Sequence, residues 1–200
     1  MERLQKQLDF IVEIDRIKTI YRQNVLIHED RQENDAEHSW HLAVMAMLLK
    51  EHFSDPHIDL LKSIKMALIH DLVEIYAGDT FCYDEEGKKD KLEREKESAN
   101  RLFALLPDDQ SEEFHDLWEE FEQAASGEAQ FAACLDRLQP LLLNINTKGH
   151  TWRKPGVTKE KILQRNAILR DNAPKLWTFV VQAVEDGVAK GYIREYAGKR

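Results

Sequence analysis

A short stretch in the first half of the chain carries several side chains that could bind a metal ion and move a proton. Residues 67–79 read ALIHDLVEIYAGD, an apolar run that contains His70, Asp71, Glu74 and Asp79. Neutral imidazole and carboxylate groups are common ligands of divalent cations. The structural alternative is a buried histidine bonded to a neighbouring helix beside an exposed aspartate. Further ligands elsewhere in the chain must decide between these two interpretations.

The placement of these residues on a helix indicates that they line a cavity and do not form a solvent-exposed helix face. If residues 58–77 form one helix, Glu74 falls in angle between His70 and Asp71, one turn further along. The same side carries alanine and serine, whereas the opposite side carries bulky apolar residues. No lysine or arginine follows Lys65 in this segment. The ionisable groups are therefore predicted to face a cavity.

Two other segments offer further candidate ligands. NDAEHSWHLAVMAMLL contains His38 and His41, three residues apart, and AQFAACLDRLQPLLLN contains Asp136 as its only carboxylate. Either histidine could instead be an ordinary core residue, and Asp136 could form a structural ion pair, with Arg137 as its sequence neighbour. An unpaired buried carboxylate is costly, so Asp136 needs a cation, a hydrogen-bond network or solvent.

The composition indicates one soluble globular domain, which we expect to span residues 1–200. The chain has 42% hydrophobic and 32% charged residues and a formal charge of −9, which disfavours nucleic-acid polymers and anionic membranes as partners. There are two cysteines, Cys82 and Cys134. The N-terminus is too charged for a signal peptide, and no apolar run approaches a membrane span. We therefore expect a cytoplasmic protein.

The periodicity predicts an all-α fold of long helices joined by short loops. Glycine and proline lie mostly between periodic segments, and strand-like alternation is nearly absent. A longer charged loop, residues 24–34, is expected before the second helix. The expected helices cover about residues 2–23, 35–53, 58–77, 88–105, 110–125, 127–147, 158–171 and 174–190.

Three ordered motifs resemble those of a known enzyme family. RQENDAEHSWHLAVMA, ALIHDLVEIYAGDT and CLDRL are similar, in order and spacing, to the H…HD…D signature of the HD-domain metal-dependent phosphohydrolases. The resemblance is to the small single-domain branch that contains bacterial 5′-deoxynucleotidases, and it covers about residues 8–145. It implies an HD-type helical bundle with a buried divalent metal site. Residues 146–200 are expected to form a C-terminal helical extension of unknown role.

The resemblance also implies roles for individual residues. Glu74 matches the family glutamate that manages the proton of the water or of the leaving group, and Asp79 matches the aspartate that contacts sugar hydroxyls. One divalent ion is expected, which could be Mn, Co, Mg, Fe, Ni or Zn. The metal ligands that the resemblance implies are His38, His70, Asp71 and Asp136.

Phosphate recognition is expected to come from arginine, because a planar guanidinium suits phosphate oxygens. Arg22 is the first candidate and Arg31 the second, although the segment between Arg22 and His38 matches the deoxynucleotidase branch less closely. Trp40 could stack on a base, but its helical spacing among apolar residues is more typical of the core.

Together with the resemblance, these residues predict a phosphomonoesterase that acts on (deoxy)nucleoside 5′-monophosphates, with a small phosphorylated substrate as its partner. The resemblance also implies a homodimer. Two alternatives stay open at this point. One is hydrolysis of another small phosphate, such as a dNTP or an alarmone. The other is a nucleotide-binding regulatory HD module without turnover.

Overall fold

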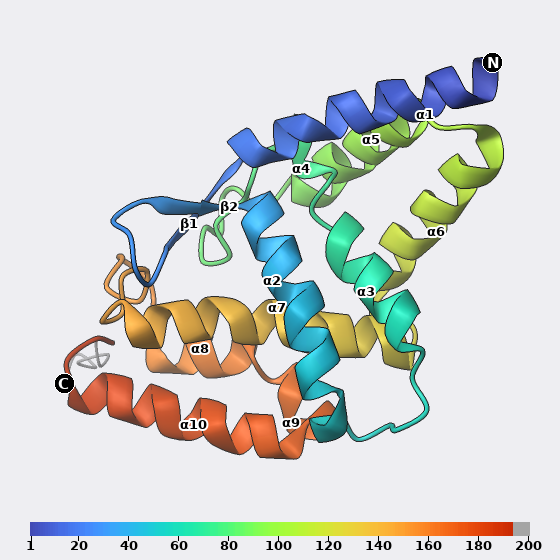
Figure 1. Ribbon diagram of the computed structural model, residues 1–200. Helices are drawn as coiled ribbons and strands as arrows, with labels where there is room; N and C mark the ends of the chain where they lie inside the picture. The colour runs from blue at the N-terminus through green and yellow to red at the C-terminus, as the bar shows by residue number, and fades with distance from the viewer. Residues whose placement is uncertain (194–200) are drawn as a thin grey trace.

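The computed structural model is mostly helical and describes residues 1–193 (Figure 1). A two-stranded antiparallel sheet and two 3-10 helices accompany the α-helices. In chain order the elements are α1 (Glu2–Glu13), η1 (Ile14–Thr19), β1 (Tyr21–Val25), β2 (Gln32–Asn34), α2 (Asp35–Leu49), η2 (Lys50–His52), α3 (Leu60–Ile69), α4 (Glu74–Ala77), α5 (Lys91–Phe103), α6 (Asp108–Gln123), α7 (Gly127–Asn146), α8 (Lys159–Arg165), α9 (Ile168–Asn172) and α10 (Pro174–Ala189). The prediction of an all-α fold is confirmed apart from this small sheet.

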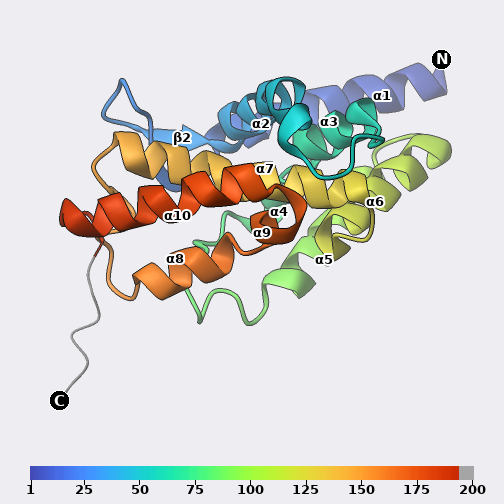
Figure 2. The same cartoon turned by 90° about the horizontal axis from the view of Figure 1, so that it is seen from below.

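Helix α7 is the central element and contributes to two hydrophobic clusters. Its Leu135 and Leu138 pack in a cluster with Leu42 of α2 and with residues of the C-terminal helices. Its Ala132 and Ala133 belong to a second cluster, formed with α1, α5 and α6. Figures 1 and 2 both show α10 running beside α7. Side chains on α7 between the two clusters are therefore held rigidly.

Side-chain caps fix where the site-bearing helices begin. Asn34 accepts a hydrogen bond from the backbone N–H of Glu37, and the Glu37 carboxylate accepts one from the Asn34 N–H, which is a capping box. Asp59 caps α3, and Ser126 caps α7 through the Ala129 N–H. Such caps satisfy backbone donors that the helix cannot pair.

The expected single helix over residues 58–77 is wrong, because the chain breaks it at the candidate site. Helix α3 ends at Ile69 and α4 begins at Glu74. Between them, the N–H of Leu72 bonds to the Ile69 carbonyl and the N–H of Glu74 to the Asp71 carbonyl, so tight i→i+3 turns replace the α-helical pattern. His70 and Asp71 therefore project from a break, and their helical-wheel angles do not apply.

The N-terminal segment also differs from its expected form. Helix α1 ends at Glu13, a 3-10 turn follows, and residues 21–25 form a strand. This strand pairs with β2, with Tyr21 opposite Asn34 and Val25 opposite Gln32. The hairpin replaces the expected loop, and side chains of both strands approach the site.

The C-terminal part of the chain packs on the same core as α2 and α7. The expected helix over 158–171 is divided into α8 and α9, whereas α10 has nearly the expected bounds. Val180 and Val184 of α10 are fully buried in the cluster that contains Leu42. Among residues 1–193, no helix combines the length and the apolar character needed to cross a membrane. The single-domain organisation stays a prediction.

Candidate active site

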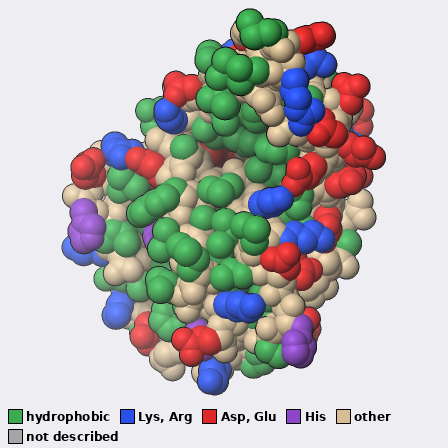
Figure 3. Space-filling model, turned by 45° about the vertical axis from the view of Figure 1, so that its right-hand side comes forward, with side chains coloured by type: hydrophobic (Ala, Val, Ile, Leu, Met, Phe, Trp, Pro, Cys, Tyr) green, Lys and Arg blue, Asp and Glu red, His purple; other side chains and the backbone are tan. Residues whose placement is uncertain are grey.

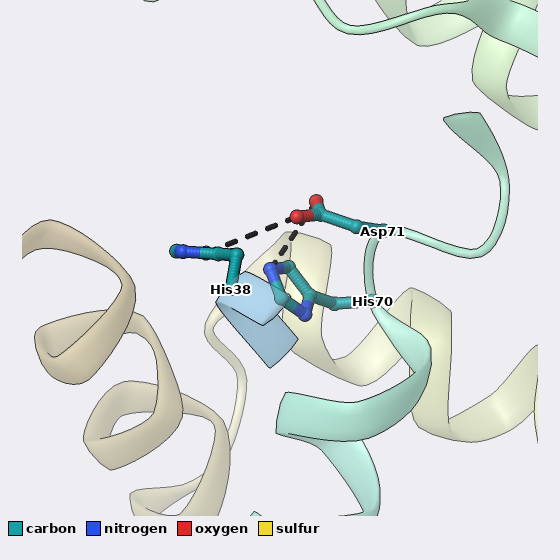
Figure 4. A group of neighbouring side chains, drawn as sticks. All are labelled: His38, His70 and Asp71. Atoms are coloured by element: carbon teal, nitrogen blue, oxygen red, sulfur yellow. Dashed lines mark ion pairs between the residues drawn. The ribbon is translucent and has the colours of Figure 1, made fainter. Parts of the chain in front are cut away.

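The four residues predicted as metal ligands lie close together. His38 comes from α2, His70 and Asp71 from the break between α3 and α4, and Asp136 from α7, and all four are buried. Nε2 of His38 lies 3.0 Å from Oδ1 of Asp136, and Nε2 of His70 lies 3.2 Å from Oδ1 of Asp71. Dashed lines in Figure 4 mark the contacts of both imidazoles with the Asp71 carboxylate.

Gln139 determines which nitrogen of His38 faces the site. Oε1 of Gln139 lies 3.0 Å from Nδ1 of His38, and Nε2 of Gln139 donates to Glu33 and approaches Nδ1 of His41. An amide oxygen can only accept, so Nδ1 of His38 is the donor and Nε2 of His38 presents a lone pair. Burial and the charge of Arg22 lower the pKa of His38 to about 4, which keeps the ring neutral.

A backbone carbonyl determines which nitrogen of His70 faces the site. Nδ1 of His70 lies 3.0 Å from the carbonyl oxygen of Ala67, which can only accept a hydrogen bond. Nε2 of His70 has no hydrogen-bond partner although it is buried. Burial opposes protonation of this ring, but the Asp71 carboxylate outweighs burial and raises the pKa of His70.

The donor set fits a divalent cation. Two Nε2 lone pairs, on His38 and His70, face two carboxylates, and lone pairs and carboxylates repel one another without a positive charge between them. His38, His70 and Asp71 each offer one ligand atom, and these atoms lie within 4.8 Å of one another. Asp136 lies within 3.9 Å of Nε2 of His70. Nitrogen and carboxylate donors together suit a borderline divalent metal ion.

Arg22 of β1 balances part of this negative charge. Its Nη1 lies 2.6 Å from Oδ2 of Asp71 and 3.2 Å from Oδ1 of Asp35, and its Nη2 lies 3.9 Å from Oδ1 of Asp136. Burial alone would lower the pKa of Arg22, but the neighbouring carboxylates outweigh burial and raise this pKa well above its ordinary value. Arg22 is thus placed beside the predicted ligands, where it could also reach a phosphate oxygen.

Glu74 is buried at the start of α4, and Oε2 of its carboxylate has no hydrogen-bond partner. Burial and the neighbouring Asp71 and Asp35 carboxylates raise the pKa of Glu74 well above its ordinary value. A protonated carboxylic acid at neutral pH can donate a proton to a leaving group. Oxygens of Asp35, Asp71 and Glu74 also lie within 4.8 Å of one another.

Asp79 lies near these residues and lines the cavity that opens beside them. The chain reaches it through Gly78, whose φ of +77° suits a residue without a side chain, as the helix α4 ends. Burial raises the pKa of Asp79, and Arg22 partly opposes this effect. Asp79 therefore adds a partly buried carboxylate to the residues that surround the candidate site.

A cavity of about 230 Å³ opens over these residues. Its lining mixes acidic side chains with lysines and arginines that come from several distant segments of the chain. Its lining comprises Arg22, His70, Asp71, Glu74, Asp79, Thr80, Cys82, Lys88, Lys91, Phe121, Glu122, Asp136, Arg137 and Arg165.

Two other candidates lie outside this cavity lining. Arg31 is exposed and pairs with both Glu29 and Glu37, at 2.6 Å from Nη2 to Oε1 of Glu37. Its role in phosphate binding stays a prediction. Trp40 is 64% exposed on α2, so the expectation of a core position is wrong, because the side chain points away from the neighbouring helices.

Sequence reasoning missed three buried residues that support the site. Glu33 and Asp35 flank the start of α2, and burial is the main reason that the pKa of each is raised to about 7. Gln139 lies one helical turn after Asp136 and is fully buried. Residues three positions apart on a helix lie on the same face, so this spacing could have identified Gln139 as a neighbour of the candidate ligand Asp136.

The chain belongs to the HD-domain family. The family model described as HD domain matches residues 14–177, which include all the predicted site residues. This assignment agrees with the helical fold and with the buried cluster of histidine and aspartate side chains.

Individual relatives and solved structures agree with this family. The 5′-deoxynucleotidase HDDC2 of Homo sapiens is 33% identical over 150 residues, which are 74% of this chain and 71% of the relative. A crystal structure of a protein from Magnetospirillum magnetotacticum, described as a predicted metal-dependent phosphohydrolase, is 47% identical, covers 96% of each chain and has a TM-score of 0.91. An HD-domain phosphohydrolase of Listeria innocua, 17% identical with a TM-score of 0.68 and covering 94% of this chain and 92% of its own, shares the fold.

Proposed function

We propose that this chain is a divalent-metal-dependent phosphohydrolase that releases phosphate from (deoxy)nucleoside 5′-monophosphates. The observation that carries the proposal is the convergence of two imidazole Nε2 atoms and two carboxylates beside Glu74, a buried acid with a raised pKa. The relative named 5′-deoxynucleotidase and the solved structure described as a metal-dependent phosphohydrolase support the same class of enzyme and substrate.

One divalent ion is proposed to be held by His38, His70, Asp71 and Asp136. When bound, it would polarise a phosphoryl oxygen and lower the pKa of a coordinated water. Gln139 and the Ala67 carbonyl keep the two imidazoles in the tautomer that presents Nε2. The surrounding nitrogen and oxygen donors accommodate Mn, Co, Mg, Fe, Ni or Zn, and the family does not distinguish among these metals.

The remaining residues are proposed to bind the substrate and supply a proton. Arg22 donates hydrogen bonds to the phosphate, and the Asp79 carboxylate accepts them from sugar hydroxyls. The oxygen of water forms a bond to phosphorus as the bond from phosphorus to the sugar oxygen breaks. Glu74 gives its proton to that leaving oxygen, and solvent then restores the proton.

A screen of phosphate release tests this proposal. The purified protein is incubated with deoxynucleoside and ribonucleoside monophosphates, and with dNTPs, in the presence of Mn²⁺, Co²⁺ or Mg²⁺. The proposal expects inorganic phosphate from monophosphates, abolished by a chelator and restored by adding metal. Pyrophosphate or triphosphate as the product would indicate a different phosphohydrolase, and no release with any substrate or metal would favour a binding module.

A homodimer is proposed because several apolar side chains of α1, α2 and α3 are exposed. Leu8, Ile11 and Val12 of α1 are 46%, 58% and 73% exposed, and Figure 3 shows hydrophobic side chains gathered on one face. Light scattering coupled to gel filtration would test this assembly, with a monomer mass at high concentration contradicting it. A cytoplasmic location is also proposed, supported by the free thiols of Cys82 and Cys134.

A further inference from the structure

A second hollow, of about 380 Å³, adjoins the cavity over the candidate site. The two hollows are adjacent, because they share four lining residues, Cys82, Lys88, Arg137 and Arg165. The second hollow contains none of the candidate metal ligands. Its full lining is Cys82, Tyr83, Glu85, Lys88, Arg137, Lys161, Gln164 and Arg165.

This hollow concentrates positive charge in a chain that is acidic overall. Four cations line it against one carboxylate, Glu85, although the chain as a whole carries a formal charge of −9. Lys88 and Lys161 share Glu85, with nitrogen-to-oxygen distances of 3.9 and 3.5 Å. Arg137 pairs with Asp136. We call these four cations, Lys88, Arg137, Lys161 and Arg165, the basic annex.

Arg165 differs from the other three because its guanidinium forms no close ion pair within residues 1–193, and only the more distant Asp136 and Asp79 carboxylates act on it. It is the last residue of α8 and is partly buried, and its side chain makes no hydrogen bond or ion pair with any residue in 1–193. Burial is the main reason that the pKa of Arg165 is lowered, and the neighbouring Arg137 adds to this effect. The guanidinium is therefore desolvated and repelled by a like charge, with its donors free toward the two hollows.

A partly desolvated guanidinium with unused donors is unfavourable for stability unless something binds it. Its planar set of N–H donors matches the oxygens of a phosphate, which it can contact through two parallel hydrogen bonds. Arg137 lies beside it and Lys88 lines both hollows, so an anion here would meet several cations. The site fits a dianionic group better than a neutral base or sugar.

We propose that the basic annex binds a second phosphate group of the nucleotide whose 5′-phosphate is hydrolysed at the site, with Arg165 as the main specificity-determining residue. The preferred substrates are then nucleotides that carry two phosphates. This inference rests on the proposed phosphohydrolase function. The second phosphate can be the 3′-phosphate of a 3′,5′-bisphosphate or the inner phosphate of a 5′-diphosphate whose terminal phosphate is hydrolysed. Inorganic phosphate is released in both cases, and the experiment distinguishes these two sources.

The kinetic test compares three substrates of the same nucleoside: the 5′-monophosphate, the 3′,5′-bisphosphate and the 5′-diphosphate. The wild-type protein is expected to prefer one of the two doubly phosphorylated compounds in kcat/KM. Arg165→Met is expected to reduce that preference by about 10- to 100-fold, mainly through KM, since charge-assisted hydrogen bonds to phosphate are lost. Loss of preference for only one compound identifies where the second phosphate is attached.

The matched control is Arg170→Met. Arg170 is exposed on α9 and pairs with Asp171, outside both hollows. Its substitution is expected to leave the substrate preference at the wild-type ratio. If Arg165→Met reduces turnover of mono- and doubly phosphorylated substrates by the same factor, Arg165 acts on the hydrolysed phosphate and the proposal is overturned.

Binding measurements separate this proposal from the proposed function. Isothermal titration calorimetry measures binding and needs no turnover. The wild-type protein and Arg165→Met are each titrated with the 5′-monophosphate, the 3′,5′-bisphosphate and the 5′-diphosphate. Tighter binding of a doubly phosphorylated compound that depends on Arg165, without phosphate release, would support the annex and contradict hydrolysis. Equal affinity for all three compounds in wild type and variant would overturn the annex whatever the activity.

Thermal melting without nucleotide gives an independent readout of the role of Arg165. A residue that holds an unpaired, desolvated charge for a ligand weakens the free protein, so Arg165→Met is expected to raise Tm. A lower Tm for Arg165→Met, with unchanged substrate preference, would indicate a purely structural arginine and contradict the proposal.

Discussion

Nε2 of His38 lies 3.0 Å from Oδ1 of Asp136, although the two residues are 98 positions apart in the sequence. Helices α2 and α7 bring them together across a packed core, and Gln139 of α7 holds the other ring nitrogen of His38. The same helix thus supplies one candidate ligand and orients another. This arrangement makes the geometry of the candidate metal site depend on a single rigid helix.

Removal of the Gln139 side-chain amide is expected to weaken metal binding. Gln139→Leu leaves Nδ1 of His38 without its acceptor, so the ring is free to adopt the wrong tautomer or rotate. Groups that orient a metal-bound histidine typically contribute about 10- to 100-fold in affinity or activity. Metal titration measures the effect. Gln130→Leu, on the same helix but bonded to the Ala124 carbonyl, is the control, and equal affinity in both variants would contradict the role of Gln139.

Glu74→Gln is expected to separate catalysis from metal binding. The amide keeps the shape of the side chain but cannot donate the proton that the raised pKa of Glu74 keeps on the acid. Loss of general acid catalysis typically lowers kcat by about 10²- to 10⁴-fold. Phosphate release and metal content are measured on the same sample. Wild-type kcat in a variant with full metal content would show that Glu74 has no part in proton transfer.

Arg22→Met is expected to destabilise the metal-free protein. Arg22 lies within 3.2 Å of Asp71 and Asp35, and loss of one partner of a buried ion pair costs about 3–5 kcal/mol. Excess Mn²⁺ should reduce the loss in Tm, because a bound cation compensates the same carboxylates. Arg31→Met, which breaks an exposed pair, is the control and should change Tm little. A variant whose Tm deficit is unaffected by Mn²⁺ would contradict this account.

The raised pKa of Glu33 predicts how stability changes with pH. Its folded-state pKa is about 7 against 4.5 in the unfolded chain, so the folded state binds more protons between these values. The free energy of unfolding therefore decreases as pH rises from about 4.5 to 7, and the full penalty applies above pH 7. Glu33→Gln cannot ionise and should raise the Tm of the metal-free protein at pH 8, with little effect at pH 5.

Glu37→Gln, at a nearby position, is expected to change Tm in the opposite direction from Glu33→Gln. Arg31 lowers the pKa of Glu37 below 4.5, so its contribution to stability is present above that value and is lost as pH falls below it. This variant should lower Tm at both pH 5 and pH 8. The account of Glu33 fails if Glu33→Gln lowers Tm more at pH 8 than at pH 5.

The sequence predicted those parts of the site that depend on residue type and motif order. His38, His70, Asp71 and Asp136 lie together as the resemblance implied, and Glu74 lies beside them. The expected starts of α2 and α7, at residues 35 and 127, also agree with the structure, where side-chain caps on Asn34 and Ser126 act locally at each start.

What the sequence could not predict depends on contacts between distant segments. Apolar periodicity continues across residues 70–73, so the break between α3 and α4 has no local signal, and tertiary packing decides it. The β1–β2 hairpin forms in a segment without strand-like alternation. Arg165 carries no motif, and only the folded chain places it beside Arg137 at the candidate site.

The most direct test of the central claim is an anomalous difference map from a crystal of this protein grown or soaked with Mn²⁺. The account predicts a peak within about 2.0–2.3 Å of Nε2 of His38, Nε2 of His70 and carboxylate oxygens of Asp71 and Asp136. A peak among Asp35, Asp71 and Glu74 without either imidazole, or no peak in the cavity at saturating Mn²⁺, would contradict it.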